Sequence, residues 1–164
     1  MKRPKTYARG KALESELRAY HVALSGAEGA PRMGRLHAAA RLGAAASDFS
    51  GLTVDGRTVL VEAKEVTSKP RFPLSMIEPH QARALREVGA AGGVAVLVVR
   101  VGAVTWALSG AALHGAMVAW VGGGAASLSV ADLDRVGARL DGVAWWGVEL
   151  KGWSEAEKMQ GRLL

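Results

Sequence analysis

The chain has 164 residues, with 21 Lys and Arg against 15 Asp and Glu, a formal net charge of +6 and no Cys. Hydrophobic residues make up 49% and charged residues 22%, a balance typical of a folded domain rather than a disordered chain. The lack of Cys excludes disulfides, thiol catalysis and Cys-based zinc sites. No apolar run predicts a membrane span. We expect one domain over residues 1–164, in a soluble, cytoplasmic protein.

The positive charge is concentrated in the N-terminal quarter of the sequence. Residues 1–41 carry nine Lys and Arg against three Glu, and the remainder is neutral overall. A localised basic region is typical of proteins that bind a polyanion, most often a nucleic acid, although a merely solubilising segment is the alternative. We interpret residues 1–9 as a basic arm. Residues 25–47, rich in Gly, Ala and Arg, are interpreted as a short basic connector that could hold a short helix.

Helical periodicity begins after the arm. Four apolar residues at spacings of four, three and four, between positions 13 and 24, predict an amphipathic helix. At about 100° per residue, Glu14 and Glu16 fall on opposite flanks of its apolar face. Either carboxylate could therefore reach a site at the edge of the core.

A β-hairpin is predicted from Asp48 onward. The stretches DFSGLTV and RTVLVEAKE are rich in β-branched residues and flank Asp55-Gly56, a strong turn signal. The following residues, 67–75, contain two Pro and predict a loop.

A second helix is expected from about Ser75 to Val88. Ser75 and Glu78 fit a capping box, Pro79 falls in the first turn, and Gly89 occupies the position after the helix end.

The rest of the chain continues a mixed α/β pattern. The apolar run at 94–101 predicts a central strand covered on both faces, and 105–109 predicts a neighbouring strand. A short helix is expected near 111–118, and a further one after the N-cap candidate Ser129. Residues 143–150 predict a last strand, on which Trp145 and Trp146 would point to opposite faces, before a polar C-terminal helix or tail.

The strand VLVEAKE carries the first chemical signal. Alternation along a strand places Glu62 and Lys64 on one face. Two charged groups on an otherwise apolar strand cost free energy unless they border a polar cleft. An ion pair on an edge strand is the alternative.

The hairpin loop decides which residue faces Glu62. A two-residue loop, Asp55-Gly56, would place Asp48 opposite Ala63, whereas a three-residue loop, 54–56, would place Asp48 opposite Glu62. Two facing carboxylates repel, and a bound divalent cation would remove the conflict because Mg²⁺ prefers hard oxygen ligands. With Lys64 beside them to hold a water or a phosphate, these residues outline a phosphodiesterase site.

These residues resemble a known motif. Ser47-Asp48 followed by Glu62-Ala63-Lys64 resembles the PD-(D/E)xK nuclease motif, with Ser47 in place of Pro. The longer stretch DFSGLTVDGRTVLVEAKEVTSKPRFPLSMIEPHQ is similar to the core of RecU-type Holliday-junction resolvases. RGKALE and GGVAVLVVRV resemble that family's first-helix motif and central strand, so the similarity covers about residues 9–109. The resemblance implies a restriction-endonuclease-like α/β fold, in which helices flank a central mixed β-sheet.

The resemblance also implies roles for individual residues. Asp48 and Glu62 would bind Mg²⁺, for which Mn²⁺ could substitute, with the Ala63 carbonyl as a further ligand. Lys64 would position or activate the attacking water. Glu14, which matches the Glu of the first-helix motif, would complete the acidic site.

The second helix is implied to contribute as well. Gln81 is the first candidate to orient water or phosphate, and His80 is the second. The alternative is that these two residues are a plain polar pair at a helix N-terminus. One departure concerns residues 25–47, which are short for the stalk that the family inserts before its metal-binding Asp.

The implied substrate is a four-way DNA junction. Because such a junction is approximately two-fold symmetric, paired cuts would follow naturally from a homodimer. The candidates for backbone contacts are the basic residues Arg3, Lys5, Arg9, Lys11, Arg32, Arg35, Arg41, Lys69 and Arg71. Two alternatives are a nuclease of the same fold that acts on duplex, flap or damaged DNA, and a non-catalytic DNA-binding recombination factor.

Overall fold

The computed structural model describes residues 10–35 and 47–153. The predicted arm, residues 36–46 of the predicted connector and the predicted C-terminal helix or tail lie outside these ranges. The elements are α1 (Gly10–Ser25), β1 (Arg32–Arg35), β2 (Phe49–Leu52), β3 (Thr58–Val66), β4 (Arg71–Pro73), the 3₁₀ helix η2 (Leu74–Met76), α2 (Pro79–Ala90), β5 (Val94–Val101), β6 (Val104–Ser109), α3 (Gly110–Val121), β7 (Ser127–Ser129), α4 (Val130–Val136) and β8 (Ala138–Arg139).

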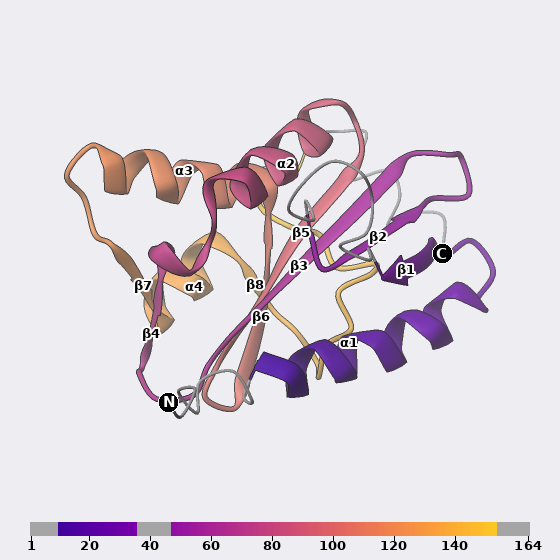
Figure 1. Cartoon of the computed structure of the whole chain (residues 1–164), viewed down its shortest axis with the longest axis horizontal. Coiled ribbons are helices and arrows are strands. Elements are labelled where there is room, and N and C mark those ends of the chain that lie inside the picture. Colours follow the sequence, from indigo (N-terminus) through magenta and orange to yellow (C-terminus); the bar gives the residue numbers. More distant parts are fainter. Residues whose placement is uncertain (1–9, 36–46, 154–164) are drawn as a thin grey trace, which may run out of the picture.

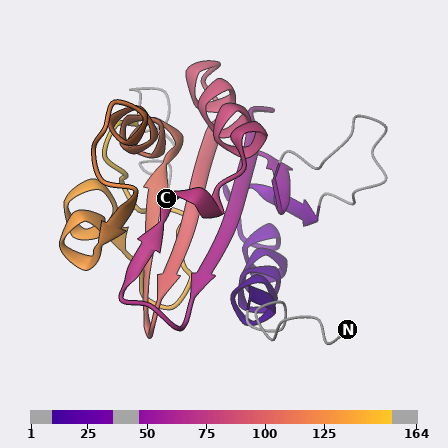
Figure 2. The same ribbon diagram turned by 60° about the vertical axis from the view of Figure 1, so that its left-hand side comes forward.

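A six-stranded mixed sheet forms the centre of the molecule, with strand order β1-β2-β3-β5-β6-β8 (Figure 1). Strands β3 and β5 are parallel, and the other neighbours in this sheet are antiparallel. Strands β4 and β7 form a separate two-stranded sheet. Figure 2 shows α1 on one side of the large sheet and α2, α3 and α4 on the other. The predicted α/β class is confirmed, and the architecture is consistent with a restriction-endonuclease-like fold.

The sheet separates two hydrophobic cores. On the α1 side, Leu13 and Leu17 pack against alternate residues of β3 and β5. On the other side, Leu85 of α2 and Leu113 of α3 pack against the intervening residues. Strand β5 is covered on both faces, which explains its continuous apolar sequence.

The hairpin between β2 and β3 has the three-residue loop. Phe49 pairs with Val61, and this register places Asp48 opposite Glu62. Within the loop, the Gly56 N–H donates to the Thr53 carbonyl, and Gly56 has a φ of +83°, as a type I turn followed by a left-handed residue requires.

Part of the predicted connector is instead a strand. Residues Arg32–Arg35 form β1, which pairs with β2 along its whole length. The close approach depends on Gly51, because a Cβ atom there would collide with the Arg32 carbonyl oxygen. An edge strand formed by pairing with a distant segment leaves little periodic signal in its own sequence, so composition alone suggested a connector.

Two further expectations between residues 67 and 90 are corrected. The predicted loop contains β4, whose residues pair with β7. Ser75 lies in η2, and α2 begins at Pro79 with Glu78 as its N-cap, one helical turn later than expected. Pro79 accounts for this start, because it is favoured at the first helical position and restricts the residue before it to an extended conformation.

The predicted strand at 143–150 is also wrong. These residues run through turns, and β8, at Ala138–Arg139, takes the place beside β6. Trp145 is fully buried in the core on the α1 side, and Trp146 packs against the same core. The apolar pattern of this segment therefore reports burial rather than strand pairing.

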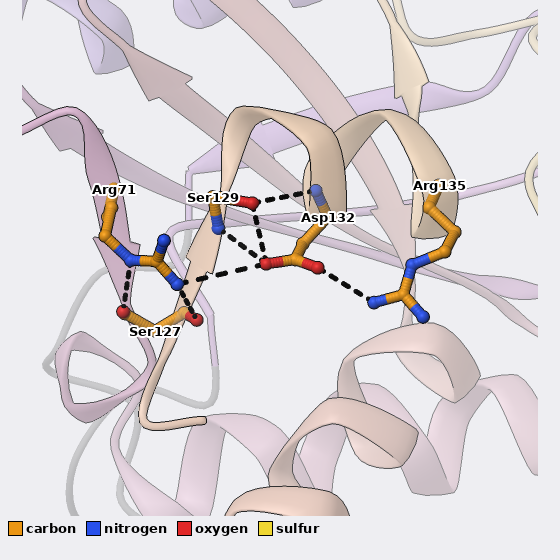
Figure 3. Close-up of polar contacts among 5 residues, drawn as sticks. All are labelled: Arg71, Ser127, Ser129, Asp132 and Arg135. Atoms are coloured by element: carbon orange, nitrogen blue, oxygen red, sulfur yellow. Dashed lines mark hydrogen bonds and ion pairs between the residues drawn. The ribbon is translucent and has the colours of Figure 1, made fainter. Parts of the chain in front are cut away.

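Polar contacts fasten the small sheet to α4 (Figure 3). The Arg71 Nε donates to Ser127 Oγ at 2.8 Å, and an Arg71 Nη lies 3.9 Å from an Asp132 carboxylate oxygen. Ser129 is the N-cap of α4, as predicted, and forms a reciprocal capping box with Asp132.

In the part of the chain that the structure describes, no helix is long and apolar enough to cross a membrane.

Candidate active site

Glu62 and Lys64 lie side by side on β3, on the face that α2 covers. Their neighbours in the alternation, Leu60 and Val66, belong to the core on that face. The Glu62 side chain is fully buried and that of Lys64 is 19% exposed. The Lys64 Nζ lies 2.7 Å from Glu62 Oε1. The predicted common face is confirmed.

Asp48 closes the site from the start of β2. Its Oδ2 accepts a hydrogen bond from the Ala63 N–H at 2.9 Å. The N–H and C=O groups of one strand residue point to the same neighbouring strand, so the Ala63 carbonyl also faces the side where β2 begins at Phe49. Two carboxylates and one carbonyl oxygen therefore converge on this end of the hairpin.

Gln81 connects α2 to the site. Its Oε1 accepts from the backbone N–H of Glu78 at 3.0 Å, and its Nε2 donates to Glu62 Oε1 at 2.7 Å. The hydrogen bond to Glu78 caps α2 and fixes the orientation of the Gln81 side-chain amide. With its oxygen on the Glu78 N–H, the amide directs its Nε2 toward Glu62. The sequence reasoning missed this role of Glu78, although the spacing Glu78-x-x-Gln81 carries the capping signal. His80 is exposed, one residue before Gln81.

The second carboxylate oxygen of Glu62 has no hydrogen-bond partner in the described residues, although it is buried. Burial raises the pKa of Glu62 to about 7, the nearby Asp48 adds to the shift, and Lys64 opposes it. A buried carboxylate oxygen without a donor costs free energy. A hard divalent cation would satisfy it, and the carboxylate and carbonyl donors present are ligands that Mg²⁺ accepts.

Glu14 and Glu16 lie on α1, which covers the opposite face of the sheet from Glu62. Glu16 is bound by Arg100 of β5, with N–O distances of 2.9 and 2.6 Å. At about 100° per residue, Glu14 is on the other flank of α1 from Glu16. Over residues 10–35 and 47–153, no three His or acidic residues form a group that could hold a metal ion, so the structure does not bring Glu14 into a close cluster with Asp48 and Glu62.

The predicted DNA-contacting residues are dispersed. Lys11, Arg32 and Lys69 are exposed, on α1, on β1 and before β4 respectively. Arg71 is exposed too, but its guanidinium is held by Ser127 and Asp132. Arg35 ends β1. Arg3, Lys5, Arg9 and Arg41 lie outside the described residues.

Comparison with known families agrees with the geometry. The sequence model of the family named Recombination protein U, or RecU, matches residues 30–141, more than half of the chain. The chain belongs to the RecU family. The RecU match contains Asp48, Glu62, Lys64 and Gln81, and Glu14 precedes it. The resemblance inferred from the sequence is thereby confirmed.

One curated RecU protein is similar over part of its length. The Holliday junction resolvase RecU of Shouchella clausii (strain KSM-K16) is 39% identical over 57 residues. That alignment covers 35% of this chain and 27% of the relative, so the chain matches little more than a quarter of the relative's length.

Proposed function

We propose that this chain is a metal-dependent endodeoxyribonuclease that resolves four-way (Holliday) DNA junctions. The observation that carries the proposal is the pair of facing carboxylates, Asp48 and Glu62, beside Lys64, with a buried Glu62 oxygen that no donor within residues 10–35 and 47–153 satisfies. Membership of the RecU family and the name of the curated relative support a junction as the substrate.

The residues proposed to hold the cation are Asp48, Glu62 and the Ala63 carbonyl. Mg²⁺ is the expected ion, and Mn²⁺ should substitute. When bound, such an ion supplies Lewis-acid stabilisation of the charge that develops on the phosphate oxygens.

The chain's own side chains have complementary tasks. Lys64 presents a partly exposed ammonium next to Glu62, where it can hold the attacking water or a phosphate oxygen. Gln81 fixes Glu62 through one of its carboxylate oxygens, which keeps the other directed away from the amide. Asp48 is held against the backbone of the strand that carries Glu62. These contacts fix both acids before substrate binds, which lowers the reorganisation that the reaction requires.

The substrate also suggests an assembly. A four-way junction needs two symmetric cuts, so we propose a homodimer with one site in each subunit, acting on DNA in the cytoplasm. Exposed basic side chains such as Lys11, Arg32 and Lys69 are proposed to contact the DNA backbone by shape rather than by sequence.

A cleavage assay tests the proposal. The protein is incubated with a four-way junction and with linear duplexes of the same arm sequences, with Mg²⁺, with Mn²⁺ or with a chelator. We expect paired nicks in the junction only when a divalent cation is present, and much slower cleavage of the duplex. Equal rates on both substrates would indicate a nuclease for other DNA, and junction binding without cleavage would indicate a non-catalytic recombination factor.

A further inference from the structure

The arginines whose side chains the structure describes fall into two groups according to their partners. Five of them make ion pairs with acidic side chains: Arg57 with Asp55, Arg71 with Asp132, Arg100 with Glu16, Arg135 with Asp132, and Arg139 with Asp134. Figure 3 shows two members of this group, Arg71 and Arg135, on either side of the one carboxylate that they share. The charge of these arginines is already compensated within the fold.

Four other arginines make no ion pair within the described residues: Arg18, Arg32, Arg83 and Arg86. All four side chains are exposed. Two of them, Arg83 and Arg86, lie three residues apart on α2 and so are neighbours on the helix surface. An exposed cation without an acidic partner is free to bind an anion from solution.

Helix α2 carries these two arginines within two turns of Gln81, the residue that contacts the carboxylate site. Its first turn carries Gln81, which contacts Glu62, and its buried residue Leu85 fixes the helix on the sheet. With a rise of about 1.5 Å and a turn of about 100° per residue, Arg83 and Arg86 lie roughly 3 and 8 Å along the helix axis from Gln81 and about 160° and 140° around it, on the outer surface of the helix. Helix α2 packs on the face of β3 that carries Glu62 and Lys64.

The acidic residue nearest to them in sequence, Glu87, is a neighbour of Arg83 on the helix surface but makes no ion pair with it in the described residues. It lines a pocket that also includes Arg57, beside the β2–β3 turn, and it makes no ion pair within 4.0 Å in the described part of the chain. Arg83 and Arg86 are thus two neighbouring guanidinium groups without an ion pair in the described residues, on a helix whose two exposed acids, Glu78 at the N-cap and Glu87, balance their charge overall. A guanidinium group binds a phosphate through paired N–H donors, so these two side chains suit contacts to the DNA backbone.

We propose that Arg83 and Arg86 bind backbone phosphates of the DNA strand that enters the carboxylate site. This inference rests on the proposed function, because it takes the bound polyanion to be the nuclease's own substrate. The arginines hold the strand without reading its sequence, since phosphate contacts fix position and register rather than base identity. Arg71, although predicted from the sequence as a DNA contact, is assigned a structural role because Ser127 and Asp132 already hold it.

The salt dependence of DNA binding tests the assignment. We compare the wild type with Arg83→Ala/Arg86→Ala and with Arg135→Ala, which removes an arginine that is already paired. Ala is the best helix former, so both exposed positions should tolerate it, and a thermal melt of each variant checks this. Affinity for a four-way junction is measured in chelator over a range of salt concentrations. A third variant, Arg83→Lys/Arg86→Lys, retains the charge.

The double Ala variant should lower the slope of log K against log salt by about 2, because each phosphate contact contributes about 0.9. Arg135→Ala should leave the slope unchanged, and the Lys variant should restore most of it. An unchanged slope in a folded double Ala variant, or an equal fall with Arg135→Ala, would overturn the inference.

Cleavage by the wild type, measured in parallel, separates this inference from the proposed function. Junction cleavage together with an unchanged slope contradicts only the role of the two arginines. A lowered slope without any cleavage upholds the phosphate contacts and contradicts the nuclease. A wild type that binds no DNA contradicts both.

Discussion

At the scale of single residues, two buried polar side chains, Glu62 and His21, each keep one atom without a hydrogen-bond partner among the described residues: Oε2 of Glu62 and Nδ1 of His21. In the part of the chain that the structure describes, Glu62 has one oxygen without a donor beside a second carboxylate, an arrangement that costs stability and is typical of functional sites. His21 is 3% exposed, and its Nε2 accepts a hydrogen bond from Trp145 Nε1 at 2.9 Å. This contact ties α1 to the segment that follows β8, and it requires a neutral ring.

We predict that His21 makes the fold sensitive to acid. Burial lowers the pKa of His21 from 6.5 to about 4. The unfolded chain therefore binds the proton more tightly, so the stabilisation is fully present above pH 6.5 and is lost as the pH falls toward 4. The loss should reach roughly 3 kcal/mol, and urea unfolding at a series of pH values measures it.

A control isolates this effect from the carboxylates that also titrate in acid. The variant His21→Gln keeps a group that can accept from Trp145 but does not titrate in this range. Its stability should fall less steeply between pH 6.5 and pH 4.5 than that of the wild type. Parallel curves for the two proteins would contradict the role given to His21.

At the scale of elements, local sequence signals and tertiary contacts contribute differently. The hairpin was predictable because Asp55-Gly56 is a local turn signal, but the sequence left two registers open. The structure has the register in which Gly56 adopts a positive φ and Asp48 faces Glu62. Strand β1 and the irregular segment 143–150 were not predictable, because pairing with β2 and burial against α1 are tertiary effects.

The two predicted N-caps give a direct comparison. Ser129 accepts from the Asp132 N–H and caps α4, whereas Ser75 is exposed in η2 and caps no α-helix. Ser129→Ala should therefore lower the free energy of unfolding by about 1 kcal/mol. Ser75→Ala should change it by less than about 0.5 kcal/mol. Chemical denaturation of both variants measures the difference, and equal losses would contradict the observed start of α2.

At the scale of the whole molecule, the sequence predicted the α/β class, the common face of Glu62 and Lys64, and a basic N-terminal quarter. It could not show which cations the fold neutralises. That depends on contacts between distant residues, such as Arg100 with Glu16. Nor could it show that Gln81 contacts Glu62, because that contact requires α2 to pack over β3.

The central claim is that Asp48 and Glu62 form the catalytic site, and Asp48→Asn tests it most directly. Asn keeps an oxygen that can accept from the Ala63 N–H, so the hairpin should remain folded, but the carboxylate charge is lost. Junction binding in chelator and nicking in Mg²⁺ are measured on the same preparation. We predict binding close to that of the wild type and a loss of nicking of at least about 100-fold, as expected when several kcal/mol of charge stabilisation disappear. Undiminished nicking by a folded Asp48→Asn protein would contradict this site.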